Sequence, residues 1–232
     1  YTHFGTDWNV IVTDNVQIDE YKYRLGGVTN GNGDNLDGVQ FNIGKTDVLW
    51  TINDGNGNQI SCQFIVIVLD NEPPELDCLT LEDQEVSTDS GLGYYTHNGT
   101  SWDLTADNAT DNVGISRVYF TLTGANTGNG VTLNGQVFKA GKTKVTWTAE
   151  DKQGNKDTCS FIVTVIDTEP PELLRDCLAI GDQVVSTNKG ENIYTHPANN
   201  KNWDVIATDN VGVKDVTYVL TGVTELSSPT TG

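Results

Sequence analysis

Short runs of alternating polar and apolar residues, many of them β-branched, recur along this chain. The clearest lie at 63–68, 144–148 and 160–165, and no long stretch shows the 3.6-residue apolar period of an amphipathic helix. Clusters rich in Gly, Asn and Asp, such as 54–58 and 151–155, separate these runs and are typical of hairpin turns. The pattern predicts an all-β fold built from antiparallel β-sandwiches.

The sequence repeats itself with a period of about 97 residues. Trp50 returns as Trp147 and Cys62 as Cys159, since 147 − 50 and 159 − 62 both equal 97. Two tripeptides occur three times, namely Tyr-Thr-His at 1–3, 95–97 and 194–196 and Thr-Asp-Asn at 13–15, 110–112 and 208–210. A period this long corresponds to a whole small domain. We therefore expect tandem domains in an elongated array, and such repetition argues against an enzyme.

Two Glu-Pro-Pro segments, at 72–74 and 169–171, mark the expected domain joints because proline ends strands and stiffens linkers. They divide the chain into three predicted repeats. Residues 73–169 form the complete one. Residues 1–72 lack a counterpart of its first strand, and residues 170–232 lack counterparts of its C-terminal strands. The chain is thus expected to be a window on a longer array.

Charge narrows the choice of partners. The 232 residues include 32 acidic and 13 basic side chains, for a formal net charge of −19. Phosphate binding needs a basic face, so nucleic acid is excluded as a partner. The sequence contains no run of 18 apolar residues, so we expect no membrane insertion in this segment.

The four cysteines occupy repeat positions, which suggests disulfides in an oxidising, extracellular setting. The first and last strands of a sandwich start at the same pole, so we predict a bond between Cys78 and Cys159, worth roughly 4–5 kcal/mol. Cys62 is a poor partner for Cys78 because the strand that follows it runs some 20–25 Å away. The alternative is four free buried thiols in a cytosolic protein.

Several elements resemble the HYR (hyalin repeat) domain. They are Trp147 to Asp151, Gly154-Asn155, Cys159-Ser160-Phe161 and Pro170-Pro171, together with their copies from Trp50 to Pro74. Two departures are Cys78-Leu79 and Cys177-Leu178, where the family usually has Cys-Pro. The resemblance implies immunoglobulin-like, extracellular domains with a role in adhesion. It also implies a setting such as the long arrays on bacterial surface adhesins of gliding Bacteroidetes.

Acidic residues from distant segments are predicted to meet at one pole of each sandwich. The incoming joint, the exit loop of the second strand and the last hairpin all lie there, which brings together Asp70, Glu72, Asp111, Asn112 and Asp151. A second set begins with Asp167, Glu169, Asp209 and Asn210, and the first repeat contributes Asp14 and Asp54. Converging carboxylate and carbonyl oxygens suit Ca²⁺. The alternative is that these residues only form turns and solvated surface.

The remaining candidate residues point to packing rather than chemistry. His3, His97 and His196 occur once per repeat and cannot form a local zinc cluster. The five tryptophans also occupy repeat positions, which is typical of core anchors. We therefore expect a non-catalytic spacer or adhesin stalk at the cell surface, stiffened by Ca²⁺. Its partners would be neighbouring repeats, surface glycans or other surface proteins, and the alternative function is an array of carbohydrate-binding modules on exposed tryptophans.

Overall fold

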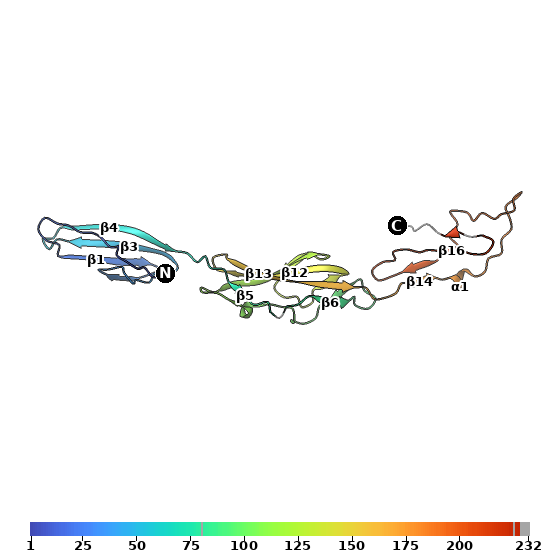
Figure 1. The fold of residues 1–232 in the computed structure, drawn as a ribbon, viewed down its shortest axis with the longest axis horizontal. Helices are drawn as coiled ribbons and strands as arrows, with labels where there is room; N and C mark the ends of the chain where they lie inside the picture. Colours follow the sequence, from blue (N-terminus) through green and yellow to red (C-terminus); the bar gives the residue numbers. More distant parts are fainter. Residues whose placement is uncertain (80, 225, 228–232) are drawn as a thin grey trace. The chain divides into compact units, whose positions relative to one another are not determined.

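The computed structural model describes residues 1–79, 81–224 and 226–227, and these residues are almost entirely in strands and loops (Figure 1). They form two compact units. The first unit comprises residues 1–74 together with 111–116 and 150–156. The second comprises 75–110, 117–149 and 157–232. The all-β fold with antiparallel sheets is therefore confirmed, whereas the three repeat boundaries stay a prediction.

Residues 20–68 form a four-stranded antiparallel sheet in the order β2-β1-β3-β4. Its strands are β1 (Glu20–Gly27), β2 (Gly31–Gly33), β3 (Gly44–Asn53) and β4 (Gln59–Val68). Alternation places Val48, Trp50 and Ile52 of β3 in the core, where they meet Phe41 and Leu36. The predicted turn 54–58 joins β3 to β4, and β4 lies at one edge of this sheet.

A five-stranded sheet has the order β10-β9-β12-β13-β6. Its strands are β6 (Gln84–Ser87), β9 (Ile115–Gly124), β10 (Gly128–Gly130), β12 (Gly141–Asp151) and β13 (Lys156–Ile166). The predicted runs 144–148 and 160–165 lie inside β12 and β13. β6 pairs with β13 in parallel, so an early strand and the last strand of this segment lie side by side as the sequence predicted.

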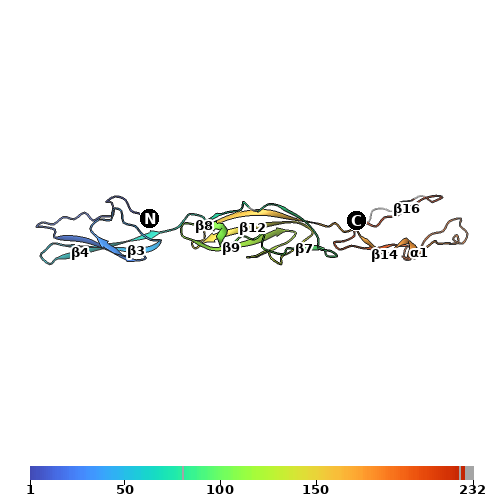
Figure 2. The same cartoon turned by 90° about the horizontal axis from the view of Figure 1, so that it is seen from below.

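Two short antiparallel pairs contribute the other side of this core (Figure 2). They are β5 (Glu75–Leu76) with β8 (Ala109–Thr110), and β7 (Tyr94–Thr96) with β11 (Val137–Lys139). A single 3₁₀ turn, η1 (Ala106–Asn108), precedes β8. Leu76 and Phe138 from these pairs pack in one core with Trp102 and Trp147. Trp102 is 8% exposed and Trp147 is fully buried, as the repeat positions predicted. Trp50 is also fully buried, so these three tryptophans offer no sugar-binding platform.

One disulfide links Cys78 to Cys159 with a Cα–Cα distance of 6.2 Å, which confirms the predicted pairing. Cys62 and Cys177 are free and exposed. Both alternatives, a Cys62–Cys78 bond and four buried free thiols, are therefore wrong for this structure.

Residues 170–227 contain only short elements. β14 (Glu172–Arg175) pairs with β15 (Ile206–Thr208), and β16 (Val219–Leu220) pairs with β17 (Leu226–Ser227). A four-residue helix, α1 (Cys177–Ile180), was not expected from the sequence. It forms because the Asp176 carboxylate accepts a hydrogen bond from the Ala179 N–H over 2.8 Å, which caps the first turn. Across the described residues, the structure contains no helix of the length and apolarity that a membrane span requires.

Candidate metal centre

Three carboxylates from distant parts of the sequence meet within the first unit. Asp70 follows β4, Asp111 follows β8, and Asp151 ends β12. One carboxylate oxygen from each lies within 4.8 Å of the other two. Among the described residues, these three side chains form the group whose ligand atoms lie close enough together to hold a metal ion. Asp70 is 6% exposed and Asp151 is 2% exposed, whereas Asp111 is half-buried. The three segments therefore lie together, whereas the role of these carboxylates as metal ligands stays a prediction.

Local turns hold the carboxylates of Asp70 and Asp111 by one oxygen each. Asp111 Oδ1 accepts from the N–H groups of Val113 and Gly114 over 2.8 and 2.6 Å. Asp70 Oδ1 accepts from the Glu72 N–H over 3.2 Å. Aspartate is favoured in such turns because its short side chain bonds its own backbone two or three residues ahead. The turn thereby fixes the direction of the second oxygen.

The second oxygens of Asp70 and Asp111 are buried and have no hydrogen-bond partner. A buried carboxylate oxygen without a partner is costly, because it has given up its water without compensation. Here two such oxygens lie beside a third carboxylate, so the cost of desolvation is increased by repulsion between like charges. A cation bound among them would remove both penalties.

Asp151 is the most strongly held of the three. Its Oδ1 accepts from the N–H groups of Gln153 and Asn155, each over 2.8 Å, and its Oδ2 accepts from the Asn155 side chain over 2.7 Å. Burial by itself would raise the pKa of Asp151, but the hydrogen bonds from the Asn155 side chain and from the turn backbone outweigh it and lower this pKa. The side chain is therefore an anion at neutral pH, as a metal ligand must be.

Asn155 belongs to this site although the sequence analysis did not select it. Its side-chain amide donates to the backbone carbonyl of Asp70 over 3.1 Å as well as to Asp151. The sequence feature that could have identified Asn155 is its repeat counterpart Asn58. The Asn58 side chain donates a hydrogen bond to the Asp54 carboxylate, as Asn155 does to Asp151. Glu72 and Asn112, which we predicted as ligands, bond each other instead, since Asn112 Nδ2 donates to Glu72 Oε2 over 2.9 Å.

The second predicted set of ligands, which begins with Asp167 and Glu169, makes contacts that differ from those of the first set. Both carboxylate oxygens of Glu169 accept from the Gly91 N–H over 3.0 Å, and Asn210 donates to the carbonyl of Leu92 over 3.0 Å. Asp209 Oδ1 accepts from the N–H groups of Val211 and Gly212. The Gly212 and Val211 bonds, with a smaller contribution from Asp167, lower the pKa of Asp209. Among the described residues, Asp167 and Asp209 join no group of three metal-ligating side chains.

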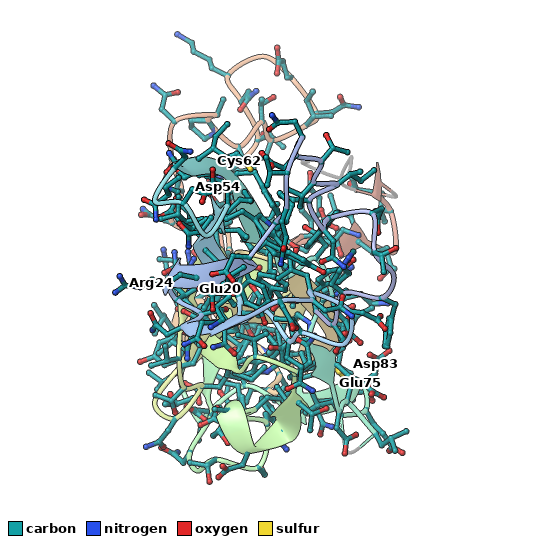
Figure 3. The ribbon with its side chains drawn as sticks, turned by 90° about the vertical axis from the view of Figure 1, so that its left-hand side faces the viewer. Glu20, Arg24, Asp54, Cys62, Glu75 and Asp83 are labelled. Atoms are coloured by element: carbon teal, nitrogen blue, oxygen red, sulfur yellow. A yellow bond between two sulfur atoms is a disulfide. The ribbon has the colours of Figure 1, made fainter. Side chains whose placement is uncertain are left out.

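The first repeat shows part of the same arrangement. Asp14 and Asp54 line a cavity of about 280 Å³ together with Asn15 and Asn58. Asp54 lies in the β3–β4 turn (Figure 3), where hydrogen bonds from the Asn58 side chain and from the Asn56 N–H lower its pKa. Asp14 accepts from the N–H groups of Val16 and Gln17, which repeats the turn at Asp111.

The donor chemistry of the centre favours a hard cation. All three ligands are carboxylates, and no histidine or cysteine among the described residues joins the group. Oxygen-only sites suit Ca²⁺ and Mg²⁺, whereas nitrogen and sulfur ligands select zinc and copper. Ca²⁺ accepts irregular coordination by six to eight oxygens, including carbonyls and water, while Mg²⁺ demands a tight octahedron. Three turn-borne carboxylates fit the looser requirement of Ca²⁺.

The histidines have a packing role. His97 is buried and stacks on Trp102 with ring centroids 3.8 Å apart, and His3 stacks on Trp8 at 3.9 Å. His196 repeats the stack on Trp203 at 4.1 Å. The three stacks explain why Tyr-Thr-His and a following tryptophan recur in each repeat.

A comparison with known proteins matches a segment that contains all three carboxylates of the candidate centre. The family model of the HYR domain matches residues 69–165. The sea urchin (Strongylocentrotus purpuratus) protein hyalin is 28% identical over 187 residues, which is 78% of this chain and 14% of hyalin. The rat (Rattus norvegicus) sushi, von Willebrand factor type A, EGF and pentraxin domain-containing protein 1 is 32% identical over 126 residues. Those residues are 54% of this chain and 3% of the rat protein, so the chain spans only a small part of these relatives.

Among solved structures, cadherin domains 1–4 of protocadherin γB7 are similar at 15% identity and a TM-score of 0.29, covering 72% of this chain and 46% of that one. The human desmocollin-1 ectodomain is similar at 12% identity and a TM-score of 0.21, covering 56% of this chain and 28% of that one. The named relatives in sequence are animal proteins, so the bacterial setting stays an expectation.

Proposed function

We propose that this chain, whose residues 69–165 match the family model of the HYR domain, is a non-catalytic, adhesive segment of an extracellular surface protein, and that it is a spacer stiffened by Ca²⁺. The cation would bind Asp70, Asp111 and Asp151. Neighbouring repeats are the proposed partners within the parent protein, with surface glycans or other surface proteins as further partners.

An extracellular, adhesive role is supported by several independent features. The disulfide between Cys78 and Cys159 suits an oxidising compartment. A net charge of −19 keeps the surface solvated and disfavours nonspecific association. The relatives that the chain resembles are hyalin and a protein of sushi, EGF and pentraxin domains. Tandem repeats lengthen a protein, as a spacer requires. An enzyme would instead need a single reactive cleft.

One observation carries the calcium proposal. The Oδ2 atoms of Asp70 and Asp111 are buried without partners, in the same group of three carboxylates as Asp151. If Asp70 and Asp111 formed only turns, their Oδ1 bonds would suffice, and nothing would require their second oxygens to be buried. A bound cation gives these oxygens a partner.

Stiffening follows from the positions of the ligands in the sequence. Asp70 belongs to the exit of β4, whereas Asp111 and Asp151 belong to the predicted repeat 73–169. Without a cation, like charges at this spacing repel by on the order of 1 kcal/mol per pair even with the screening of water. With Ca²⁺, repulsion becomes ligation, and the three segments are held in one arrangement. Binding to the native state alone also stabilises it, by RT ln(1 + [L]/Kd).

The proposal is tested by melting temperature and solution radius of gyration, each measured with Ca²⁺ and then with excess chelator. At a Ca²⁺ concentration one hundred times Kd, the gain of about 2.7 kcal/mol corresponds to a rise of about 5–10 °C. Asp111→Asn should remove most of this response. The matched control is Asp107→Asn, which changes an exposed carboxylate on η1 a few residues away. An unchanged melting temperature and radius of gyration in the unaltered chain would contradict the proposal.

A further inference from the structure

A disulfide joins the beginning of the segment that matches the HYR model to its last strand. Cys78 follows β5, and Cys159 lies near the start of β13. The two cysteines are 81 positions apart in the sequence, and their Cα atoms are 6.2 Å apart. Both are half-buried against the core. The covalent path from Cys78 to Cys159 through the sulfur atoms therefore bypasses residues 79–158, and with them most of the core side chains.

The same two parts of the chain also form a parallel ladder. β6 pairs with β13, with Gln84 opposite Val163 and Val86 opposite Val165. The pairing is parallel and the disulfide precedes the paired part of both strands, so β6 and β13 run away from it in the same direction. If the disulfide were open, a pull on the chain before β6 against the chain after β13 would slide one strand along the other. The ladder would then bear the load in shear.

The closed disulfide sends the load along another path. Tension that reaches Cys78 from its N-terminal side passes through the two sulfur atoms to Cys159 and leaves along β13. Residues 159–166 lie within that single strand. Tension that enters and leaves the same strand stretches the strand but does not slide it past β12 and β6, its two neighbours. The ladder between β6 and β13 is therefore outside the load path while the bond is closed.

The loaded strand is already close to its full length. A β-strand rises about 3.2–3.4 Å per residue, and a fully stretched chain spans at most about 3.3–3.6 Å per residue. Residues 159–166 can therefore lengthen by only about a tenth. The lead-in to Cys78 is short as well, since β5 comprises two residues and is separated from Cys78 by one residue. Little chain is thus free to extend along this path.

We propose that the segment from Glu75 to Ile166 is a force-bearing link of nearly constant length, in which the disulfide and β13 bear the load. The rest of this fold, including the stacked rings of His97 and Trp102, stays unloaded while the bond is closed. The proposal deepens the proposed function and rests on it, because constant length under tension is useful only in a spacer that is pulled. It assigns the Cys78–Cys159 bond a mechanical role besides its contribution to stability.

Opening the bond should make the link extensible. The load then passes through the chain that leads to β6 and shears the ladder with β13. Once the ladder breaks, the residues between Cys78 and Cys159 can be pulled out. A separation of 81 residues corresponds to roughly 270–290 Å of fully stretched chain, in place of the 6.2 Å across the closed bond. This difference in length is large enough to measure on a single molecule.

Single-molecule force spectroscopy on the full chain tests the length. The chain is held by cysteine-free peptide tags at its two ends, in excess chelator. The fully stretched Cys78→Ser/Cys159→Ser variant should be longer than the unaltered chain by roughly 270–290 Å. The control Cys62→Ser/Cys177→Ser, which removes the two free thiols, should match the unaltered chain. Equal lengths of the unaltered chain and Cys78→Ser/Cys159→Ser would overturn the proposal.

A second experiment tests the path of the load and needs no cysteine substitution. A dithiol reductant added to the held, folded chain reduces the Cys78–Cys159 bond to two thiols and is itself oxidised to a cyclic disulfide. In this opened state at constant force, Val86→Ala should release the extra length at least about threefold faster than the unaltered chain, because Val86 packs on the core beside the sheared ladder. Glu85→Ala is the matched control, since Glu85 is exposed on the same strand.

With the bond closed, neither substitution should change the force–extension curve, because β6 is outside the load path. A changed curve for Val86→Ala with the bond closed, or equal release rates for Val86→Ala and Glu85→Ala with the bond open, would contradict the proposal. Excess chelator keeps Ca²⁺ out of both experiments. A failure here therefore leaves the response of the melting temperature to Ca²⁺ as a separate test of the proposed function.

Discussion

The side-chain amide of Asn155 donates a hydrogen bond to the backbone carbonyl of Asp70 over 3.1 Å, joining residues 85 positions apart. The same amide nitrogen donates to Asp151 Oδ2 over 2.7 Å. Asn155 thus positions two of the three carboxylates of the candidate metal centre through one side chain. This contact links the exit of β4 to the β12–β13 turn.

Asn155→Ala should destabilise the protein by about 1–3 kcal/mol, because it leaves buried acceptors without their donor. It should also weaken Ca²⁺ binding, since the turn no longer fixes Asp151 relative to Asp70. Urea unfolding measures the first effect. The matched control is Asn58→Ala, whose side chain bonds Asp54 in the equivalent turn of the first repeat. A loss of stability no larger than that of Asn58→Ala would show that the contact to Asp70 contributes little.

The two fully buried tryptophans Trp147 and Trp50 differ in one hydrogen bond. Trp147 Nε1 donates to the carbonyl of Trp102 over 3.1 Å, whereas Trp50 Nε1 is buried without a partner. Replacement by phenylalanine removes similar volume at both sites. Trp147→Phe should therefore cost about 1–2 kcal/mol more than Trp50→Phe, because only the first leaves a buried carbonyl unpaired. Equal losses in chemical denaturation would argue against this difference.

His97 makes stability depend on pH. Burial lowers its pKa, with Asp103 and the Gly99 backbone acting in the opposite direction, and both ring nitrogens are buried without partners. The unfolded chain, with a histidine pKa near 6.5, therefore binds more protons than the folded chain as the pH falls. Stability should be constant above about pH 6.5 and should decrease below it.

His97→Phe should flatten this dependence between about pH 7 and 5.5, because phenylalanine keeps an aromatic ring on Trp102 and does not titrate. Thermal unfolding at several pH values measures the slope. His196→Phe is the control, since His196 is only half-buried in its stack on Trp203. If stability depends on pH equally steeply in His97→Phe and in the unaltered chain, a group other than His97 causes the loss of stability at low pH.

The sequence predicted features that depend on local pattern and on strand order. Alternation located β4, β12 and β13, and the common pole of the first and last strands led to the Cys78–Cys159 bond. Repetition likewise predicted that Trp102 and Trp147 are buried, because a core residue recurs wherever the core recurs.

The individual contacts within the site could not be predicted from the sequence. Sequence pattern brought Asp70, Asp111 and Asp151 to one pole, but it did not show that Glu72 bonds Asn112 instead of facing the cluster. Nor did it select Asn155, whose role depends on a backbone carbonyl that carries no sequence signal. Helix α1 was missed because a single aspartate cap outweighs the weak strand preference of four residues.

Isothermal titration calorimetry with Ca²⁺ tests the central claim most directly, because it reports binding without relying on any change in shape. The account predicts saturable binding to the unaltered chain, loss of one equivalent on Asp70→Asn or Asp111→Asn, and retention of that equivalent in Asp107→Asn. Mg²⁺ at the same concentration should bind more weakly, since three turn-borne carboxylates do not impose a tight octahedron. The contradicting result is the absence of Ca²⁺ binding to the unaltered chain, or binding that persists undiminished in both aspartate variants. The three carboxylates would then be turn residues alone.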